Sequence, residues 1–165
     1  MKRAVVILLL SPLNYLTSAQ AQFWERLEGT YGGAARAIAV SPNNHLFAGM
    51  EGANGVDVYR STNSGTTWTA TNNYPTSFIS STSLAVNPSG YIFSGDNNGG
   101  GMFRSTDDGA SWTQINAGLT ELSIQALTIN KAGHVFVGVQ YGGVFRSTDA
   151  GAWSSGHLGH LPRPP

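Results

Sequence analysis

The chain contains no cysteine, and only 11% of its 165 residues are charged. The lack of cysteine excludes disulfide scaffolds, thiol nucleophiles and zinc sites built on thiolates. Lysine plus arginine and aspartate plus glutamate each number 9, so the formal net charge is zero. A nucleic-acid-binding protein needs a basic face. The sequence therefore predicts neither thiol chemistry nor a nucleic-acid partner.

Turn-forming and hydrophobic residues are both abundant. Glycine occurs 21 times, while 41% of the residues are hydrophobic and 10% are aromatic. That hydrophobic share is too high for a disordered chain. Because a domain has about 150 residues as a rule of thumb, the length leaves room for one. The composition predicts a single, turn-rich β domain.

The N-terminal residues have the order of regions found in a signal peptide. Two basic residues precede the apolar run 4–10, and the small residues Ala19 and Ala21 follow. The run is far shorter than the roughly 20 residues that span a bilayer. We therefore predict that residues 1–21 are cleaved, that the protein is secreted to the periplasm or the extracellular space, and that no membrane span follows cleavage.

A segment of the form aromatic-Arg-Ser-Thr occurs three times, and its arginines lie 44 and 42 positions apart. Two short predicted strands joined by a turn precede each copy at nearly constant distance. A repeat in the low forties with four short strands is typical of a β-propeller blade, because one such sheet cannot bury both of its faces alone. The predicted fold is all-β, with about three four-stranded antiparallel blades over residues 22–153. The arginines are Arg60, Arg104 and Arg146, for which the repeat predicts a shared packing or ion-pair role.

The fourth strands of the first two units are predicted to begin at Trp68 and Trp112, and Trp24 matches the same position, so the chain is predicted to open on a fourth-type strand before the first unit. No fourth strand is expected after Trp153, and residues 154–165 are predicted to form an irregular tail. Closed propellers have about four to eight blades, so the sequence predicts an incomplete propeller. We expect a truncated or frame-shifted form of a longer protein, with a ring of two chains as the alternative. Open blade edges also favour self-association.

A recurring motif follows each of the three arginines, and we call its copies (61–68, 105–112 and 147–153) the box hairpins. An Asp or Asn accepts bonds from backbone N–H groups of the turn, a Gly permits positive φ, and a Trp buries its ring. The motif therefore predicts a structural role. Its defined positions are Ser61, Asn63, Gly65, Trp68, Ser105, Asp107, Gly109, Trp112, Ser147, Asp149, Gly151 and Trp153.

The box hairpins resemble the Asp-box, or bacterial neuraminidase repeat, of sialidase-type, sortilin-type and xyloglucanase-type β-propellers. The second copy fits at every defined position, whereas the first has Asn63 for Asp and the third lacks one residue before Trp153. The resemblance covers residues 23–153 and implies propeller architecture. In those families the motif stabilises hairpins at the blade periphery, away from the catalytic centre.

The loops that follow the second strand of each repeat differ most from one another. A propeller's binding surface is built from unlike loops on like strands, so we take Glu51, Asp96, Gln140 and Tyr141 as candidate binding residues. Glu51 and Asp96 also occupy nearly matching positions in their repeats. They are therefore candidate catalytic residues for glycoside hydrolysis, which needs two carboxylates.

Other patterns carry less chemistry. The glycine-rich segment 97–101 has no P-loop lysine and no following helix. His45 and His134 share one repeat position, which favours strand residues over metal ligands. We predict no metal and no cofactor.

The leading functional hypothesis is an exported, non-catalytic propeller segment that presents loops to a protein or a carbohydrate. One alternative is the N-terminal part of a sialidase-like or xyloglucanase-like glycoside hydrolase, with Glu51 or Asp96 among its acids. The resemblance also admits a propeller similar to the Asp-box factor that helps to build photosystem II.

Overall fold

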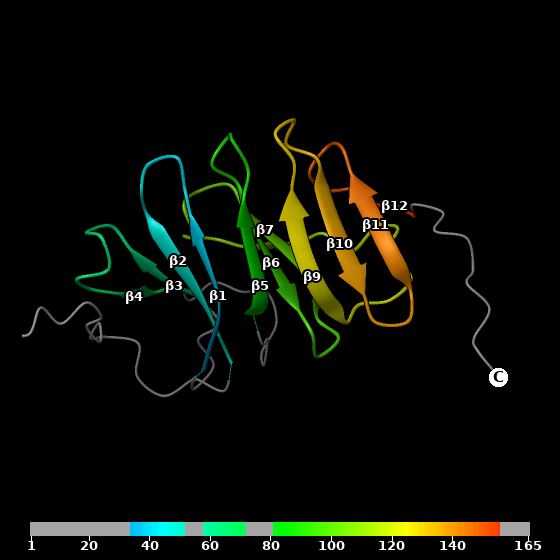
Figure 1. Cartoon of the computed structure of the whole chain (residues 1–165), viewed down its shortest axis with the longest axis horizontal. Helices are drawn as coiled ribbons and strands as arrows, with labels where there is room; N and C mark the ends of the chain where they lie inside the picture. Colours follow the sequence, from blue (N-terminus) through cyan, green and yellow to red (C-terminus); the bar gives the residue numbers. More distant parts are fainter. Residues whose placement is uncertain (1–33, 52–57, 72–80, 156–165) are drawn as a thin grey trace, which may run out of the picture.

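The computed structural model describes residues 34–51, 58–71 and 81–155. They form three four-stranded sheets, in each of which the strands lie in chain order. All strand pairs are antiparallel. The sheets follow one another along the molecule (Figure 1), and we call them blades 1, 2 and 3. This confirms the predicted all-β fold of propeller blades.

The strands are short, and the fourth strand of each blade has only two residues. Blade 1 contains β1 (Ala34–Val40), β2 (Leu46–Glu51), β3 (Val58–Ser61) and β4 (Thr69–Ala70). Blade 2 contains β5 (Ser81–Val86), β6 (Ile92–Asp96), β7 (Gly101–Ser105) and β8 (Thr113–Gln114). Blade 3 contains β9 (Ile124–Ile129), β10 (Val135–Val139), β11 (Gly143–Ser147) and β12 (Ser154–Ser155).

The first two strands of every blade are joined by a turn in which one residue has positive φ. This residue is Asn44 in blade 1 (φ 60°), Gly90 in blade 2 (φ 84°) and Gly133 in blade 3 (φ 82°). Asn and Gly adopt this conformation more readily than other residues. Three different turn sequences therefore produce the same hairpin.

Of the three hydrophobic clusters in the described ranges, two lie between neighbouring blades and one lies within blade 1. Phe47 of blade 1 packs in one cluster with Phe103 and Trp112 of blade 2. Phe93 of blade 2 packs in a second cluster with Trp153 of blade 3. Burying a phenylalanine side chain contributes about 1.5–3 kcal/mol. Each blade is thus stabilised mainly by the next one.

Polar contacts cross the same boundaries. The Asp108 carboxylate of blade 2 lies 2.8 Å from His45 Nδ1 and 3.0 Å from Arg60 Nη1 of blade 1. At the next boundary, Trp153 Nε1 donates to the Ile115 carbonyl oxygen at 2.5 Å. These contacts fix each blade in one orientation against its neighbour.

Blade 3 has a fourth strand, contrary to the expectation that none follows Trp153. Ser154 pairs with Arg146 in β11, as Thr113 pairs with Arg104 in blade 2. The turn absorbs the missing residue, because Asp149 Oδ1 accepts a bond from the N–H three positions ahead, whereas Asp107 Oδ1 accepts one from four positions ahead. The predicted tail therefore loses its first two residues to β12.

Several predictions fall outside the described residues. These are the signal peptide (1–21), the fourth strand at Trp24 and the remainder of the tail (156–165). Within the described ranges, no helix is long and apolar enough to cross a membrane.

Candidate functional site

The box hairpin of blade 2 shows how the motif is built. Ser105 Oγ donates to Asp107 Oδ1 at 2.8 Å and accepts a bond from the Gly109 N–H at 2.9 Å. Asp107 Oδ1 also accepts from the Ser111 N–H at 2.8 Å, and Asp107 Oδ2 accepts from Ser111 Oγ at 2.5 Å. The side chains of Ser105 and Asp107 thus close the turn from both ends.

The other two hairpins reproduce this network. In blade 1, Asn63 Oδ1 accepts from the Thr67 N–H at 2.9 Å, so asparagine replaces aspartate without loss of the acceptor. In blade 3, Asp149 Oδ1 accepts from the Ala152 N–H at 2.9 Å and from Ser147 Oγ at 3.0 Å. All three acids or amides bond within their own hairpins.

Two box carboxylates have altered acidity. The hydrogen bond from the Ser111 side chain, followed by other bonds of the turn, lowers the pKa of Asp107. The hydrogen bond from the Ala152 backbone N–H, with that from Ser147, lowers the pKa of Asp149. Both groups are exposed, so hydrogen bonding to the ionised form is the dominant cause. Neither has the raised pKa of a general acid at neutral pH.

Glu51 and Asp96 lie in strands and not in loops, contrary to the sequence-based prediction. Glu51 is the last residue of β2 and Asp96 the last of β6, because both strands run past the glycines expected to end them. Glu51 pairs with Ala34 in register, and Asp96 pairs with Ser81. In register, Asp96 corresponds to Met50 of blade 1, and Glu51 lies one residue further along β2. The two acids therefore occupy neighbouring and not equivalent blade positions.

Each of these acids already has a partner in its own blade. Glu51 forms an ion pair with Arg36 of β1. Asp96 is only 1% exposed, and its carboxylate accepts bonds from the Asn98 N–H at 3.1 Å and the Gly100 N–H at 2.6 Å. A Cβ on Gly100 would lie 2.4 Å from Asp96 Oδ2. Segment 97–101 therefore folds around the buried Asp96 carboxylate. The catalytic role of Glu51 and Asp96 stays a prediction.

The β10–β11 loop carries the other two candidates, Gln140 and Tyr141. Tyr141 is 90% exposed and has φ 61°. A non-glycine residue with positive φ is uncommon, and such strained backbone conformations cluster at binding and catalytic sites. Gln140 is also exposed, and its backbone N–H donates to the Ser123 carbonyl at 2.9 Å.

Ser123 connects this loop to the β6–β7 loop of blade 2. Its Oγ donates to the Asn97 carbonyl at 2.6 Å, while its own carbonyl accepts from the Gln140 N–H. The sequence alone gives no sign that the two loops are in contact. The structure brings 97–100 and 140–141 together around one buried serine, which is 7% exposed. We call these two segments the loop surface.

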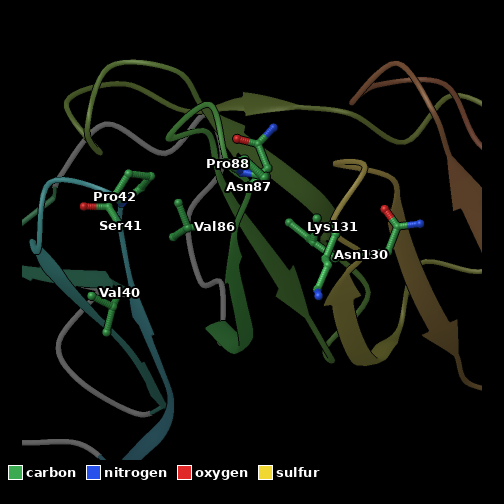
Figure 2. A pocket seen from close by; sticks show the side chains of 9 residues that line it. Val40, Ser41, Pro42, Val86, Asn87, Pro88, Asn130 and Lys131 are labelled. Carbon is green, nitrogen blue, oxygen red and sulfur yellow. The ribbon is translucent and has the colours of Figure 1, made fainter.

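A groove at the opposite edge of the blades was missed by the sequence analysis. It has a volume of about 370 Å³ and is open to solvent. It lies where the first strands end and their turns begin (Figure 2). The turns that form the groove recur at the same position of each repeat, and this regular spacing is the sequence signal that could have revealed the groove. The lining residues are Val40, Ser41, Pro42, Val86, Asn87, Pro88, Ile129, Asn130 and Lys131.

The polar side chains of the groove stabilise its turns. Ser41 Oγ accepts from the His45 N–H at 3.2 Å, Asn87 Oδ1 from the Tyr91 N–H at 2.8 Å, and Asn130 Oδ1 from the His134 N–H at 2.9 Å. No group of three or more histidine, aspartate or glutamate side chains in the described ranges is arranged to hold a metal ion. The residues that line the groove form no catalytic arrangement.

No family model matches the chain, and no match was found among curated proteins. Solved propeller structures are nevertheless similar. For the GH74 xyloglucanase from Xanthomonas campestris, the TM-score is 0.59 at 22% identity, and the match covers 78% of this chain and 24% of that one. For YCF48 bound to D1 peptide, the TM-score is 0.56 at 20% identity, covering 73% of this chain and 39% of that one.

A third similar structure is the virginiamycin B lyase from Staphylococcus aureus, with a TM-score of 0.61 at 16% identity. That match covers 76% of this chain and 41% of the lyase. The chain thus spans less than half the length of each of these three proteins. At such identities the similarity shows the fold alone, and the proteins that share it include a glycoside hydrolase and a lyase. The chain is an all-β protein built from β-propeller blades.

Proposed function

We propose that the chain is an exported, non-catalytic propeller segment of the Asp-box type that binds carbohydrate through its loop surface. The observation that carries this proposal is Tyr141, which is 90% exposed at positive φ. An aromatic ring held away from the core loses the free energy of burial and needs another reason to be there. Tyrosine offers an apolar face together with a polar hydroxyl. That combination suits the apolar faces and the hydroxyl groups of a sugar.

The neighbouring groups supply the remaining chemistry of a sugar site. The exposed side chains of Gln140 and Asn98 are neutral donors and acceptors, and both belong to the loop surface. Because Ser123 links their loops, these groups are held in one arrangement before a ligand arrives. Such preorganisation lowers the entropy cost of binding.

The contacts of the two acids support a non-catalytic role. The Asp96 carboxylate is buried and accepts two backbone hydrogen bonds, whereas a catalytic acid must reach the glycosidic bond. Glu51 is held by Arg36. Both carboxylates are thus engaged in the structure of their own blades.

The test is to measure the binding of soluble polysaccharides, xyloglucan among them, by calorimetry. Tyr141→Ala should weaken binding about tenfold or more, while Tyr141→Phe, which keeps the ring, should retain most of it. The side chain is exposed, so neither variant should change the unfolding free energy by more than about 0.5 kcal/mol. Binding that is unchanged in Tyr141→Ala, or no binding to any glycan tested, would contradict the proposal.

Glycoside hydrolysis is the second candidate, favoured by the nearly matching positions of Glu51 and Asp96, which are one residue apart in register, and by the similarity to a xyloglucanase fold. Release of reducing ends from xyloglucan or sialosides would support it. The activity would have to be lost in Glu51→Gln and kept in Asp107→Asn, which alters a box carboxylate. The proposed function predicts no release by the unmodified protein.

A protein ligand is the other occupant that the same loops would suit, because exposed tyrosines are enriched in protein interfaces. The similar YCF48 structure contains a D1 peptide. Peptide binding that is lost in Tyr141→Ala, with no glycan binding, would favour this alternative.

A further inference from the structure

The register of the strands gives every blade two distinct faces. On the face that we call trailing, Phe47, Phe93 and Phe136 hold the same position in blades 1, 2 and 3. Phe47 and Phe93 are fully buried against the following blade, whereas Phe136 is only half-buried. Within the described ranges, no further blade covers the trailing face of blade 3.

The arginines of the repeat connect each trailing face to the following blade. Arg60 Nη1 donates to the Asp108 carbonyl at 2.9 Å, and Arg104 Nη1 donates to the Ala150 carbonyl at 2.8 Å. Asp108 and Ala150 occupy the same box-hairpin position, with φ values of 59° and 62°. Arg146 is the equivalent donor in blade 3, and its side chain is exposed.

A glycine marks close approach on the same face. A Cβ on Gly49 would lie 2.5 Å from the Ser81 carbonyl oxygen of blade 2, and one on Gly95 would lie 2.6 Å from Ile124 Cγ2 of blade 3. Gly138 is the equivalent residue in blade 3, where an added Cβ would meet only Ala126 of its own blade, at 3.6 Å. Blade 3 thus has glycine at a position where blades 1 and 2 need it for close contact with the following blade.

The complementary surface is the β1 part of the leading face of blade 1, since Ala48 and Met50 of β2 on the same face are buried against Tyr59 and Trp68. Ile38 and Val40 on this face are 68% and 56% exposed. Their counterparts in blade 2, Leu84 and Val86, pack into the cluster shared with blade 1. Ser64, with φ 57°, holds in blade 1 the hairpin position whose carbonyl accepts an arginine in blades 2 and 3.

We propose that the trailing face of blade 3 docks onto the leading face of blade 1 in a second copy of this chain. Phe136 packs toward Ile38 and Val40, and Arg146 donates to the Ser64 carbonyl, so the contact continues the two blade interfaces inside the chain. A head-to-tail contact of this kind closes into a ring when the rotation permits. Two copies would bring six of the described blades together, within the range of closed propellers. This inference is independent of the proposed sugar site.

The first test is the mass of the full chain in solution, measured by light scattering over a wide range of protein concentrations. We expect a dimer, and Phe136→Asp should raise its dissociation constant by a factor on the order of ten or more. The matched control is Thr106→Asp, which adds the same charge at an exposed position of the blade 2 hairpin. A monomer at all concentrations, or a dimer that Phe136→Asp leaves intact, would overturn the proposal.

The second test uses the absence of native cysteine. Chains carrying only Ser64→Cys are mixed with chains carrying only Arg146→Cys, and a short thiol-specific cross-linker is added. A covalent dimer is expected from the mixture, and Thr106→Cys mixed with Arg146→Cys should give none. As a control for reach, Arg60→Cys with Asp108→Cys in one chain should form an intramolecular link, because Arg60 contacts Asp108. Failure of the mixture despite success of this control would contradict the model.

Discussion

Blade 2 is covered on both faces, whereas blades 1 and 3 each have one face without a neighbour in the described part of the chain. Every residue of β6 is buried, yet its counterpart β10 alternates between buried and half-buried residues. The two strands have the same length, and each pairs in the same register with the first and third strands of its own blade. Local sequence therefore determines that a strand forms, and the adjacent blade determines how much of it is buried. The sharpest tests change equivalent residues in the two environments.

The largest contrast is expected for the trailing-face phenylalanines. Phe93→Ala should lower the unfolding free energy by about 3–5 kcal/mol, because it leaves a cavity between blades 2 and 3. Phe136→Ala should cost less, about 1–2 kcal/mol, since this side chain is only half-buried and leaves a smaller cavity. Urea denaturation at a concentration where the protein is monomeric measures both. Equal losses would show that blade 3 is covered in a way that the structure does not describe.

Adding a methyl group at equivalent glycines of blades 2 and 3, Gly95 and Gly138, tests the same comparison. Gly95→Ala should cost about 1–3 kcal/mol, since its Cβ would lie 2.4 Å from Ser83 Oγ and 2.6 Å from Ile124 Cγ2. Gly138→Ala should change the unfolding free energy of the monomer by less than about 0.5 kcal/mol, because its Cβ has only an ordinary contact. Urea denaturation distinguishes the two outcomes. A penalty at Gly138 as large as that at Gly95 would contradict the account.

The arginines test the polar part of the boundary. Arg104→Ala should destabilise the monomer by about 1–2 kcal/mol, because the Ala150 carbonyl loses its charged donor. Arg146→Ala should have an effect near zero in the monomer, as its side chain is exposed. Thermal unfolding of the two variants measures the loss of stability caused by each substitution. A loss for Arg146→Ala in a monomer equal to that for Arg104→Ala would be contrary evidence.

The smallest expected effect concerns pH and compares the box hairpins. The pKa of Asp107 and of Asp149 is lowered in the folded state, so their contribution is complete above the ordinary value of 3.8 and is lost as the pH falls through the lowered folded values. Asn63 does not titrate. Asp107→Asn, which gives blade 2 the hairpin chemistry of blade 1, should therefore reduce the loss of thermal stability between pH 6 and pH 2. An unchanged pH profile would show that the hydrogen bonds to Asp107 do not contribute.

The sequence predicted much of the fold because the repeat is visible in particular residues. The turn residues, the arginines and the box hairpins together place the three blades and nearly all of their strands. The fourth strand of blade 3 was missed, because a one-residue deletion before Trp153 obscures the motif while the turn still returns Ser154 to β11. Such compensation depends on hydrogen bonds at Asp149 that spacing does not reveal.

The candidate site was less predictable than the fold. The variable loops were identified, but Glu51 and Asp96 proved to end strands, and only tertiary contacts show that Asp96 is buried. The link through Ser123 joins residues far apart in the sequence. The groove at the opposite edge arises from three turns brought together by blade packing, which no single turn predicts.

Amide hydrogen exchange of the full chain, followed strand by strand at low and at high protein concentration, tests the central claim most directly. We expect β6 to exchange slowly at both concentrations, because both of its faces are covered within the chain. Strands β10 and β1 should exchange faster at low concentration and slow down at high concentration, as a second copy covers their faces. Exchange in β10 as slow as in β6 at low concentration, or exchange in β10 and β1 that does not depend on concentration, would contradict that claim.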